Sequence, residues 1–196
     1  MEKQKERTYV QQRVWCVRKI YISEVKMTPN EKMAFVISLA KESMSKGELP
    51  IAAAIYHGDK LVSSAHTTER EDGRFLVHAE QKALYDADMQ KLPYSVRTKL
   101  ELYTNLEPCL MCLGMAISSF VGKIYYSLEA PEDGATDFVR IAFEKRPSET
   151  WHFPKVNIGL FREESIRLFC EYVERNQNNT KHPAGLIKFA KTLAEL

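Results

Sequence analysis

Residues 100–127, LELYTNLEPCLMCLGMAISSFVGKIYYS, decide the fold because they place a helix-type segment between two strand-type segments. The flanking segments, 100–104 and 123–127, are short and rich in Leu, Ile and Tyr, which is typical of β-strands. Between them, residues 109–119 are almost entirely apolar and long enough for a buried helix. This order of elements predicts an α/β fold.

The same alternation continues on both sides of this stretch. A helix is predicted to begin at Thr28, because Thr28 can cap it, Pro29 suits its first turn and Glu31 completes a capping box. The remaining expected elements are strands at 50–56, 60–64 and 156–160 and helices at 77–87, 138–144 and 163–175. Helices alternating with five strands predict a three-layer α/β/α sandwich around a mixed five-stranded sheet.

Composition is that of an ordinary globular protein. The 196 residues carry 28 Lys and Arg against 26 Asp and Glu, a formal net charge of +2, which provides little general attraction to nucleic acid. No uncharged apolar run is long enough to span a bilayer, and the mixed-charge N-terminus does not resemble a secretory signal. We therefore expect a cytoplasmic protein without membrane association, in which the four Cys are thiols or metal ligands rather than disulfides.

We expect one domain with an extension at each end. Residues 28–176 contain the alternating elements and would form the domain. Residues 1–27 show only strand-type patches, at 14–17 and 20–22, and are interpreted as an N-terminal extension. Residues 177–196 are predicted to form a C-terminal helical extension. Its apolar stripe is typical of a helix packed on the domain and consists of Leu186, Phe189, Ala190 and Leu193.

Two motifs that each begin a predicted helix indicate the chemistry. They are HAE at residues 78–80 and PCLMC at residues 108–112. Cys109 and Cys112 are three residues apart, so one helical turn places both sulfurs on one side. With His78 as a third ligand they would bind one zinc ion. Three protein ligands leave the fourth tetrahedral position open, as in catalytic rather than structural zinc sites.

A catalytic zinc makes water nucleophilic at neutral pH, and Glu80, two residues beyond the His, is placed to act as general acid and base. This chemistry is hydrolytic attack on a carbon that bears an amine. Two other classes remain open. A zinc-stabilised binding module would need a fourth protein ligand, such as Cys16, Cys170 or another His. A dithiol redox protein would instead use Cys109 and Cys112 without any need for the carboxylate.

The combined motifs have the H-x-E … P-C-x-x-C form of zinc deaminases. From about residue 33 to 175 the sequence resembles the cytidine/purine deaminase superfamily, in particular the branch of tRNA adenosine deaminases and bacterial guanine deaminases. The resemblance is carried by GELPIAA at 47–53, HAE at 78–80 and LEPCLMC at 106–112. It implies a cytidine-deaminase-like fold, a homodimer, and three zinc ligands beside a proton-shuttling Glu80. Those ligands would be His78, Cys109 and Cys112.

The resemblance also places Thr67, Ala79 and Asn105 near the substrate. Thr67 stands where this branch has an Asn that contacts the base or ribose, and its hydroxyl cannot make the paired contacts of an amide. Asn105 either takes over polar recognition or satisfies main-chain groups after its strand. The aromatic residues at 151–153 either stack on a flat heterocycle or belong to the core.

The distribution of charge bears on the class of substrate. An enzyme acting on tRNA needs Lys and Arg to hold phosphates. The predicted helix near the C-terminus instead has an acidic balance, with three Arg and four Glu between residues 162 and 175. We therefore expect a free base, a nucleoside or a related amino-heterocycle as substrate. The wobble adenosine of tRNA is the alternative.

Overall fold

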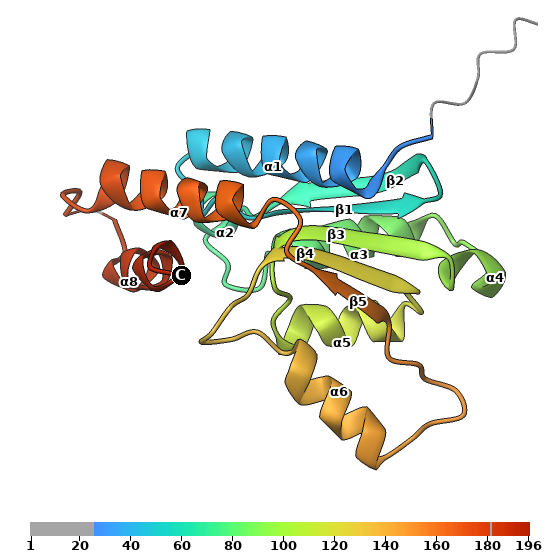
Figure 1. Cartoon of the computed structure of the whole chain (residues 1–196). Helices are drawn as coiled ribbons and strands as arrows, with labels where there is room; N and C mark the ends of the chain where they lie inside the picture. The colour runs from blue at the N-terminus through green and yellow to red at the C-terminus, as the bar shows by residue number, and fades with distance from the viewer. Residues whose placement is uncertain (1–25, 181) are drawn as a thin grey trace, which may run out of the picture.

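The computed structural model describes residues 26–180 and 182–196 (Figure 1). The strand-type patches expected at 14–17 and 20–22 lie outside these residues. No helix in the described ranges combines the length and apolar character that crossing a bilayer requires.

The centre of the fold is a five-stranded sheet with the order β2-β1-β3-β4-β5. The strands are β1 (Ala52–His57), β2 (Lys60–His66), β3 (Leu100–Leu106), β4 (Lys123–Leu128) and β5 (Lys155–Ile158). β1 is antiparallel to both β2 and β3, whereas β3, β4 and β5 run parallel. This mixed five-stranded sheet confirms the sequence-based prediction.

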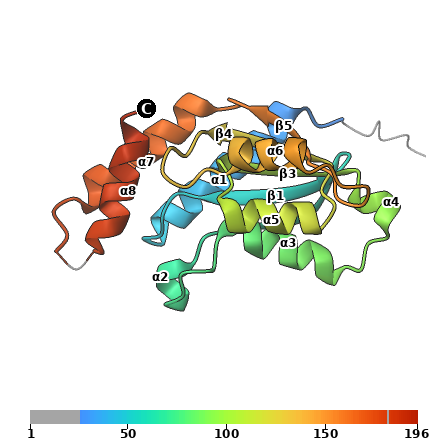
Figure 2. The same ribbon diagram turned by 90° about the horizontal axis from the view of Figure 1, so that it is seen from below.

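Helices cover both faces of the sheet, so the predicted three-layer α/β/α sandwich is also confirmed (Figures 1 and 2). One face packs against α1 (Pro29–Ser45) and α7 (Arg162–Asn176). The other packs against α3 (Ala79–Met89) and α5 (Leu110–Ser118), with α6 (Thr136–Lys145) beside α5. The last helix, α8 (Ala184–Ala194), lies along α7.

The apolar run of β1 is explained by burial on both sides. Alternate residues point to opposite faces of a strand. Ala52, Ala54 and Tyr56 therefore join the core under α1 and α7. Ala53 and Ile55 join the core under α3 and α5. A central strand between two helical layers needs apolar side chains at every position, which is why β1 shows no alternation of polar and apolar residues.

Local signals of the sequence are visible at the start of the domain. The Thr28 hydroxyl accepts a hydrogen bond from the Glu31 main-chain nitrogen at 3.2 Å, and the Glu31 carboxylate accepts one from the Thr28 nitrogen at 2.7 Å. This is the predicted capping box of α1. Two short helices were not predicted, α2 (Glu69–Asp72) within a segment that reads as a loop and α4 (Tyr94–Arg97).

A buried ion pair joins α1 to the sheet. The Lys32 ammonium lies 2.9 Å from the Glu101 carboxylate and about 5 Å from two aromatic rings, at 5.3 Å from the centroid of Tyr56 and 5.5 Å from that of Tyr103. Lys123 contacts the same carboxylate at 2.8 Å. Burial by itself raises the pKa of Glu101, but the hydrogen bonds from Lys123 and Lys32 outweigh it, so the net pKa is lowered.

Substitution of Glu101 tests this ion pair. We expect Glu101→Gln to lower the free energy of unfolding by about 2–3 kcal/mol, because the nearly buried Lys32 loses its counter-charge while the amide still accepts a hydrogen bond. A carboxyl whose pKa is lowered by folding stabilises the protein above its unfolded pKa, and this contribution is lost as pH falls through the folded pKa. Urea unfolding at pH 7 and pH 4 should therefore show a larger effect of the substitution at pH 7. An equal effect at both pH values would contradict the argument.

Candidate active site

The three candidate metal ligands are placed by the starts of two neighbouring helices. His78 is the N-cap of α3, and Cys109 is the N-cap of α5, which follows directly after β3. Cys112 is the third residue of α5 and is fully buried. Neither side chain makes the capping hydrogen bond that is usual at this position. Both side chains are therefore free to face each other.

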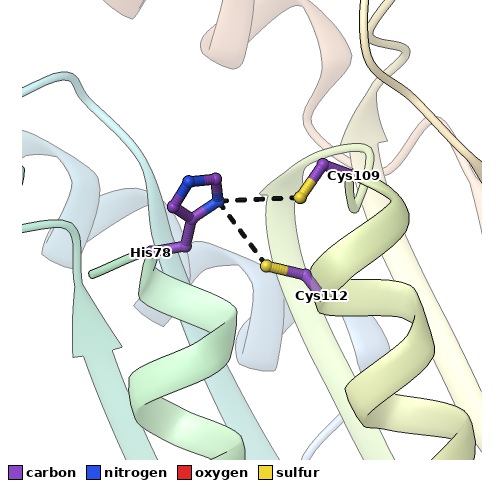
Figure 3. Close-up of side chains that lie close together, drawn as sticks. All are labelled: His78, Cys109 and Cys112. Atoms are coloured by element: carbon purple, nitrogen blue, oxygen red, sulfur yellow. Dashed lines mark hydrogen bonds between the residues drawn. The ribbon is translucent and has the colours of Figure 1, made fainter. Parts of the chain in front are cut away.

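The geometry of these side chains fits a tetrahedral zinc ion. Nδ1 of His78 lies 3.7 Å from Sγ of Cys109 and 3.6 Å from Sγ of Cys112 (Figure 3). Ideal Zn–S and Zn–N bond lengths at tetrahedral angles give an N···S separation of about 3.6 Å. No fourth His, Cys, Asp or Glu joins this group within the described residues. The donor set thus fits zinc with one coordination position left for water or substrate.

The other nitrogen of His78 is held by a carboxylate. Nε2 lies 3.1 Å from Oε1 of Glu69, in the short helix α2. A carboxylate in this position fixes the orientation of a metal-binding imidazole and increases its basicity. The main-chain nitrogens of Arg70 and Glu71 donate to the buried Glu48 carboxylate at 3.1 and 2.7 Å, which anchors α2. The unpredicted helix α2 therefore supports the metal centre.

Without a metal ion, the pKa values of the three candidate ligands are shifted in different directions. A hydrogen bond from Cys112 lowers the pKa of Cys109 to about 4 against the opposing effect of burial, and His78 adds a second favourable hydrogen bond. Hydrogen bonds to Cys109 and Glu69 raise the pKa of His78 to about 10. The hydrogen bond to Cys109 and burial raise the pKa of Cys112. Zinc ligands bind in deprotonated form, so metal binding releases the protons held by His78 and Cys112.

Glu80 lies beside the metal ligands without being one of them. Its side chain is buried, with 4% of the residue exposed, and burial raises the pKa of its carboxyl. Oε1 accepts a hydrogen bond from Oγ1 of Thr104 at 2.7 Å, and Oε2 accepts one from Sγ of Cys112 at 3.7 Å. A carboxyl with raised pKa, held at a fixed position next to a metal centre, is suited to proton transfer.

His78, Glu80 and Cys109 line a pocket of about 200 Å³, and Cys112 lies buried behind it. Pockets for drug-sized ligands have about 300–1,000 Å³, so this one suits a single ring system. Its walls combine carboxylates with apolar side chains. They are lined by Leu49, Ile51, Thr67, Glu69, Ala79, Leu106, Glu107, Asp133, Leu186 and Phe189.

The structure separates the three expected substrate-binding residues. Thr67 and Ala79 line the pocket. Asn105 does not: its Oδ1 accepts from the Ala52 nitrogen at 2.8 Å and its Nδ2 donates to the Pro50 carbonyl at 2.8 Å. Of the two roles considered for Asn105, these contacts fit the second, in which the side chain satisfies main-chain groups.

The aromatic residues expected as a possible stacking wall lie elsewhere. Trp151 stacks on Phe120, with ring centroids 4.9 Å apart and an interplanar angle of 3°. Neither ring is among the residues that line the pocket. A flat substrate therefore has to be held by other side chains.

Fold and site together define a class: a three-layer α/β protein with a three-ligand zinc centre beside a buried carboxylate. Residues 27–128 match the family described as the cytidine and deoxycytidylate deaminase zinc-binding region. The chain belongs to this family of zinc-binding deaminases, which confirms the resemblance seen in the sequence.

Similar proteins include enzymes named for tRNA. The tRNA-specific adenosine deaminase of Aquifex aeolicus is 29% identical over 143 residues, 71% of this chain and 90% of that protein. The tRNA(Ile)-lysidine synthase of Deinococcus radiodurans is 32% identical over 141 residues. That match covers 71% of this chain but only 23% of the synthase, so the chain spans about a quarter of that relative's length.

Solved structures agree with this assignment. A tRNA:A34 deaminase superposes with a TM-score of 0.60 at 27% identity, over 70% of this chain and 97% of that one. The guanine deaminase from Nitrosomonas europaea gives a TM-score of 0.58 at 24% identity, over 74% of this chain and 84% of that one, which shows a shared fold.

Several residues of the site were missed by the sequence analysis. Glu69 begins the unpredicted one-turn helix α2 and Asp133 lies between β4 and α6, and in such short segments an acidic residue carries no periodic signal. Thr104 was seen only as part of a strand, although it holds Glu80. Leu186 and Phe189 were assigned to packing because of their helical spacing. That spacing did identify their face of α8, but it could not show that the face borders a pocket.

Proposed function

We propose that the protein is a zinc-dependent hydrolase that deaminates a free nucleobase, a nucleoside or a related amino-heterocycle. One water is consumed, the carbon that carried the exocyclic amine becomes a carbonyl, and ammonia leaves. The observation that carries this proposal is the small pocket lined by Glu80 and by two of the three candidate zinc ligands, His78 and Cys109, with the third, Cys112, buried next to them.

The roles of the residues follow from their positions. When bound, zinc supplies the Lewis acidity that makes water nucleophilic at neutral pH. Glu80 accepts the proton of the attacking water on its carboxylate and delivers it to the leaving nitrogen. The hydrogen bond from Thr104 holds Oε1 in place. Oε2 becomes available for proton transfer when Cys112 gives up its proton to bind zinc. Glu69 orients His78, and the apolar walls exclude bulk water from the reaction.

The charges near the site favour a small substrate over tRNA. None of the described residues that line the pocket is a Lys or Arg, and three are carboxylates besides Glu80. On α7, the three arginines each contact a glutamate. The pairs are Arg162–Glu129, Arg167–Glu164 and Arg175–Glu171. A phosphate backbone needs unpaired cationic groups. Deamination of the wobble adenosine of tRNA remains the alternative function, because similar proteins are named for that activity.

We also propose a homodimer in the cytoplasm. Large apolar side chains are exposed along the layer of α3, α5 and α6, which lie next to one another (Figure 2). They are Tyr85, Met89, Leu110, Phe138 and Ile141, with Phe75 and Leu76 just before α3. A second copy covering this face would remove these side chains from water, as in other obligate interfaces. A reducing cytoplasm would keep both zinc-binding thiols available.

The proposed function is tested by measuring ammonia release from zinc-loaded protein. The panel should contain free purines, free pyrimidines, their nucleosides and unmodified tRNA. We expect turnover of at least one small heterocycle and none of tRNA, because the pocket fits a single ring system and lacks cationic lining residues. Glu80→Gln protein serves as the blank for contaminating deaminases.

The outcomes are distinct. Turnover of tRNA alone would reject the small substrate in favour of the alternative. Absence of ammonia from every compound, with zinc fully bound, would contradict the proposed function. Mass analysis of the product should show the amine replaced by a carbonyl oxygen.

A further inference from the structure

Helix α8 borders the active-site pocket although it lies far from the catalytic motifs in the sequence. Leu186 and Phe189 are part of the pocket lining, together with His78, Glu80 and Cys109. Both views place α8 at the end of the molecule where α2 lies and where α3 and α5 begin (Figures 1 and 2). The family match ends at residue 128, well before this helix.

The apolar stripe of α8 contacts the core with its later residues and the pocket with its earlier ones. Ala190 and Leu193 are buried in the core shared with α1 and α7 and hold the helix on the domain. Leu186 and Phe189, in the preceding turn, are only partly buried and extend the same stripe to the pocket. A stripe with i, i+3, i+4 and i+7 spacing lies on one face of a helix, so fixing its last turns also fixes the side chains at the pocket.

Contacts at both ends of α8 fix its position further. Before the helix, buried His182 lies 2.9 Å from the Tyr172 hydroxyl and 3.4 Å from Arg70, next to the residue that holds the zinc-binding His. Near its end, the Thr192 hydroxyl donates to the Glu132 carboxylate at 3.1 Å. Glu132 precedes Asp133, another residue of the pocket lining. Helix α8 is therefore tied to both segments that flank the pocket.

We infer that α8 is a specificity element that selects a free base over the corresponding nucleoside. This inference rests on the proposed function and narrows its substrate class. The reacting carbon must lie at the pocket floor, near Glu80 and the zinc ligands. In a pocket of about 200 Å³ the rest of the ring fills the remaining space against the apolar walls, where Phe189 offers a flat surface. Because Leu186 and Phe189 line this pocket, we expect them to limit the room for a ribose.

Steady-state kinetics of one free base and its nucleoside test this inference. We expect Phe189→Ala to raise KM for the base about tenfold and to change kcat less than about threefold. The reason is that the contact with Phe189 stabilises the bound substrate and its transition state equally. The kcat/KM ratio of nucleoside to base should rise about tenfold. Phe189→Leu should shift both values in the same direction by less, and it keeps the packing if the alanine variant folds poorly.

The matched control is Ile187→Ala. Ile187 is an apolar, partly buried residue of the same helix that packs against the core but does not line this pocket. Its substitution should leave the nucleoside-to-base ratio within about twofold of wild type. Equal shifts in the Phe189→Ala and Ile187→Ala variants, or no shift in either, would overturn the inference.

A second measurement does not depend on any substrate. Cys109 lines the pocket, so a closed wall should protect its thiol in zinc-free protein from a bulky maleimide more than from small iodoacetamide. Mass spectrometry of the Cys109 peptide should show that Phe189→Ala accelerates maleimide labelling about tenfold and Ile187→Ala less than about twofold. Unchanged labelling in both variants would overturn the role of α8. Accelerated labelling without turnover of any small substrate would reject the proposed function but support the role of α8 as a wall of the pocket.

Discussion

Replacement of Glu80 by Gln is expected to lower kcat by about 10²–10⁴-fold while zinc stays bound. The amide has the size of the carboxyl group and can still accept the hydrogen bond from Thr104, but it cannot carry a proton from water to the leaving nitrogen. The measurement combines ammonia release on the best substrate with the zinc content of the same sample.

A control for this substitution lies nearby. Glu71→Gln makes the same chemical change on an exposed side chain of α2, outside the pocket lining, and should leave kcat within about twofold. If Glu80→Gln with full zinc retained more than about a tenth of wild-type kcat, Glu80 would not be the proton carrier.

Replacement of Cys112 by Ser is expected to reduce zinc affinity by more than about 100-fold, a larger loss than removal of a supporting outer-shell residue causes. Cys112 is fully buried, and its sulfur lies 3.6 Å from the imidazole of His78, so no other side chain can take its place without moving α5. Zinc content after dialysis against a chelator and ammonia release should fall together, because the attacking water depends on the metal.

The matched substitution is Cys170→Ser. Cys170 is a partly buried thiol on α7 that donates to the Ala194 carbonyl at 3.7 Å, on the other side of the sheet from α5. It should keep zinc and activity at wild-type levels. Circular dichroism of both variants shows whether the fold is retained. Equal zinc retention by Cys112→Ser and Cys170→Ser would show that the ligand set is wrong.

The difference between these cysteines shows what spacing alone can predict. Cys109 and Cys112 belong to one helical turn, so their common direction follows from local geometry. Within the described residues the cluster contains no fourth ligand, which leaves the zinc-stabilised binding module unsupported. Family membership accounts for the two thiols as zinc ligands, so the dithiol redox interpretation is also unsupported.

The sequence predicted the three-layer sandwich and its five strands, which the structure confirms, and it selected the three candidate zinc ligands and Glu80, which the structure brings together. Each of these depends on residues close together in the chain: the alternation of apolar segments, the capping box at Thr28, and two short motifs at helix starts. Such signals can be interpreted from the sequence because helices and strands have the same residue periodicity in any fold.

Which residues surround those motifs depends on long-range packing. It brought Glu69 to His78 and directed the Asn105 amide to the main chain. It also placed Phe189 in the same pocket as His78, which lies more than a hundred residues earlier in the sequence. The physical reason is that the spacing of apolar residues predicts only which face of a helix is buried from water. What that face covers, a core or a pocket, depends on where the packed helices come to lie.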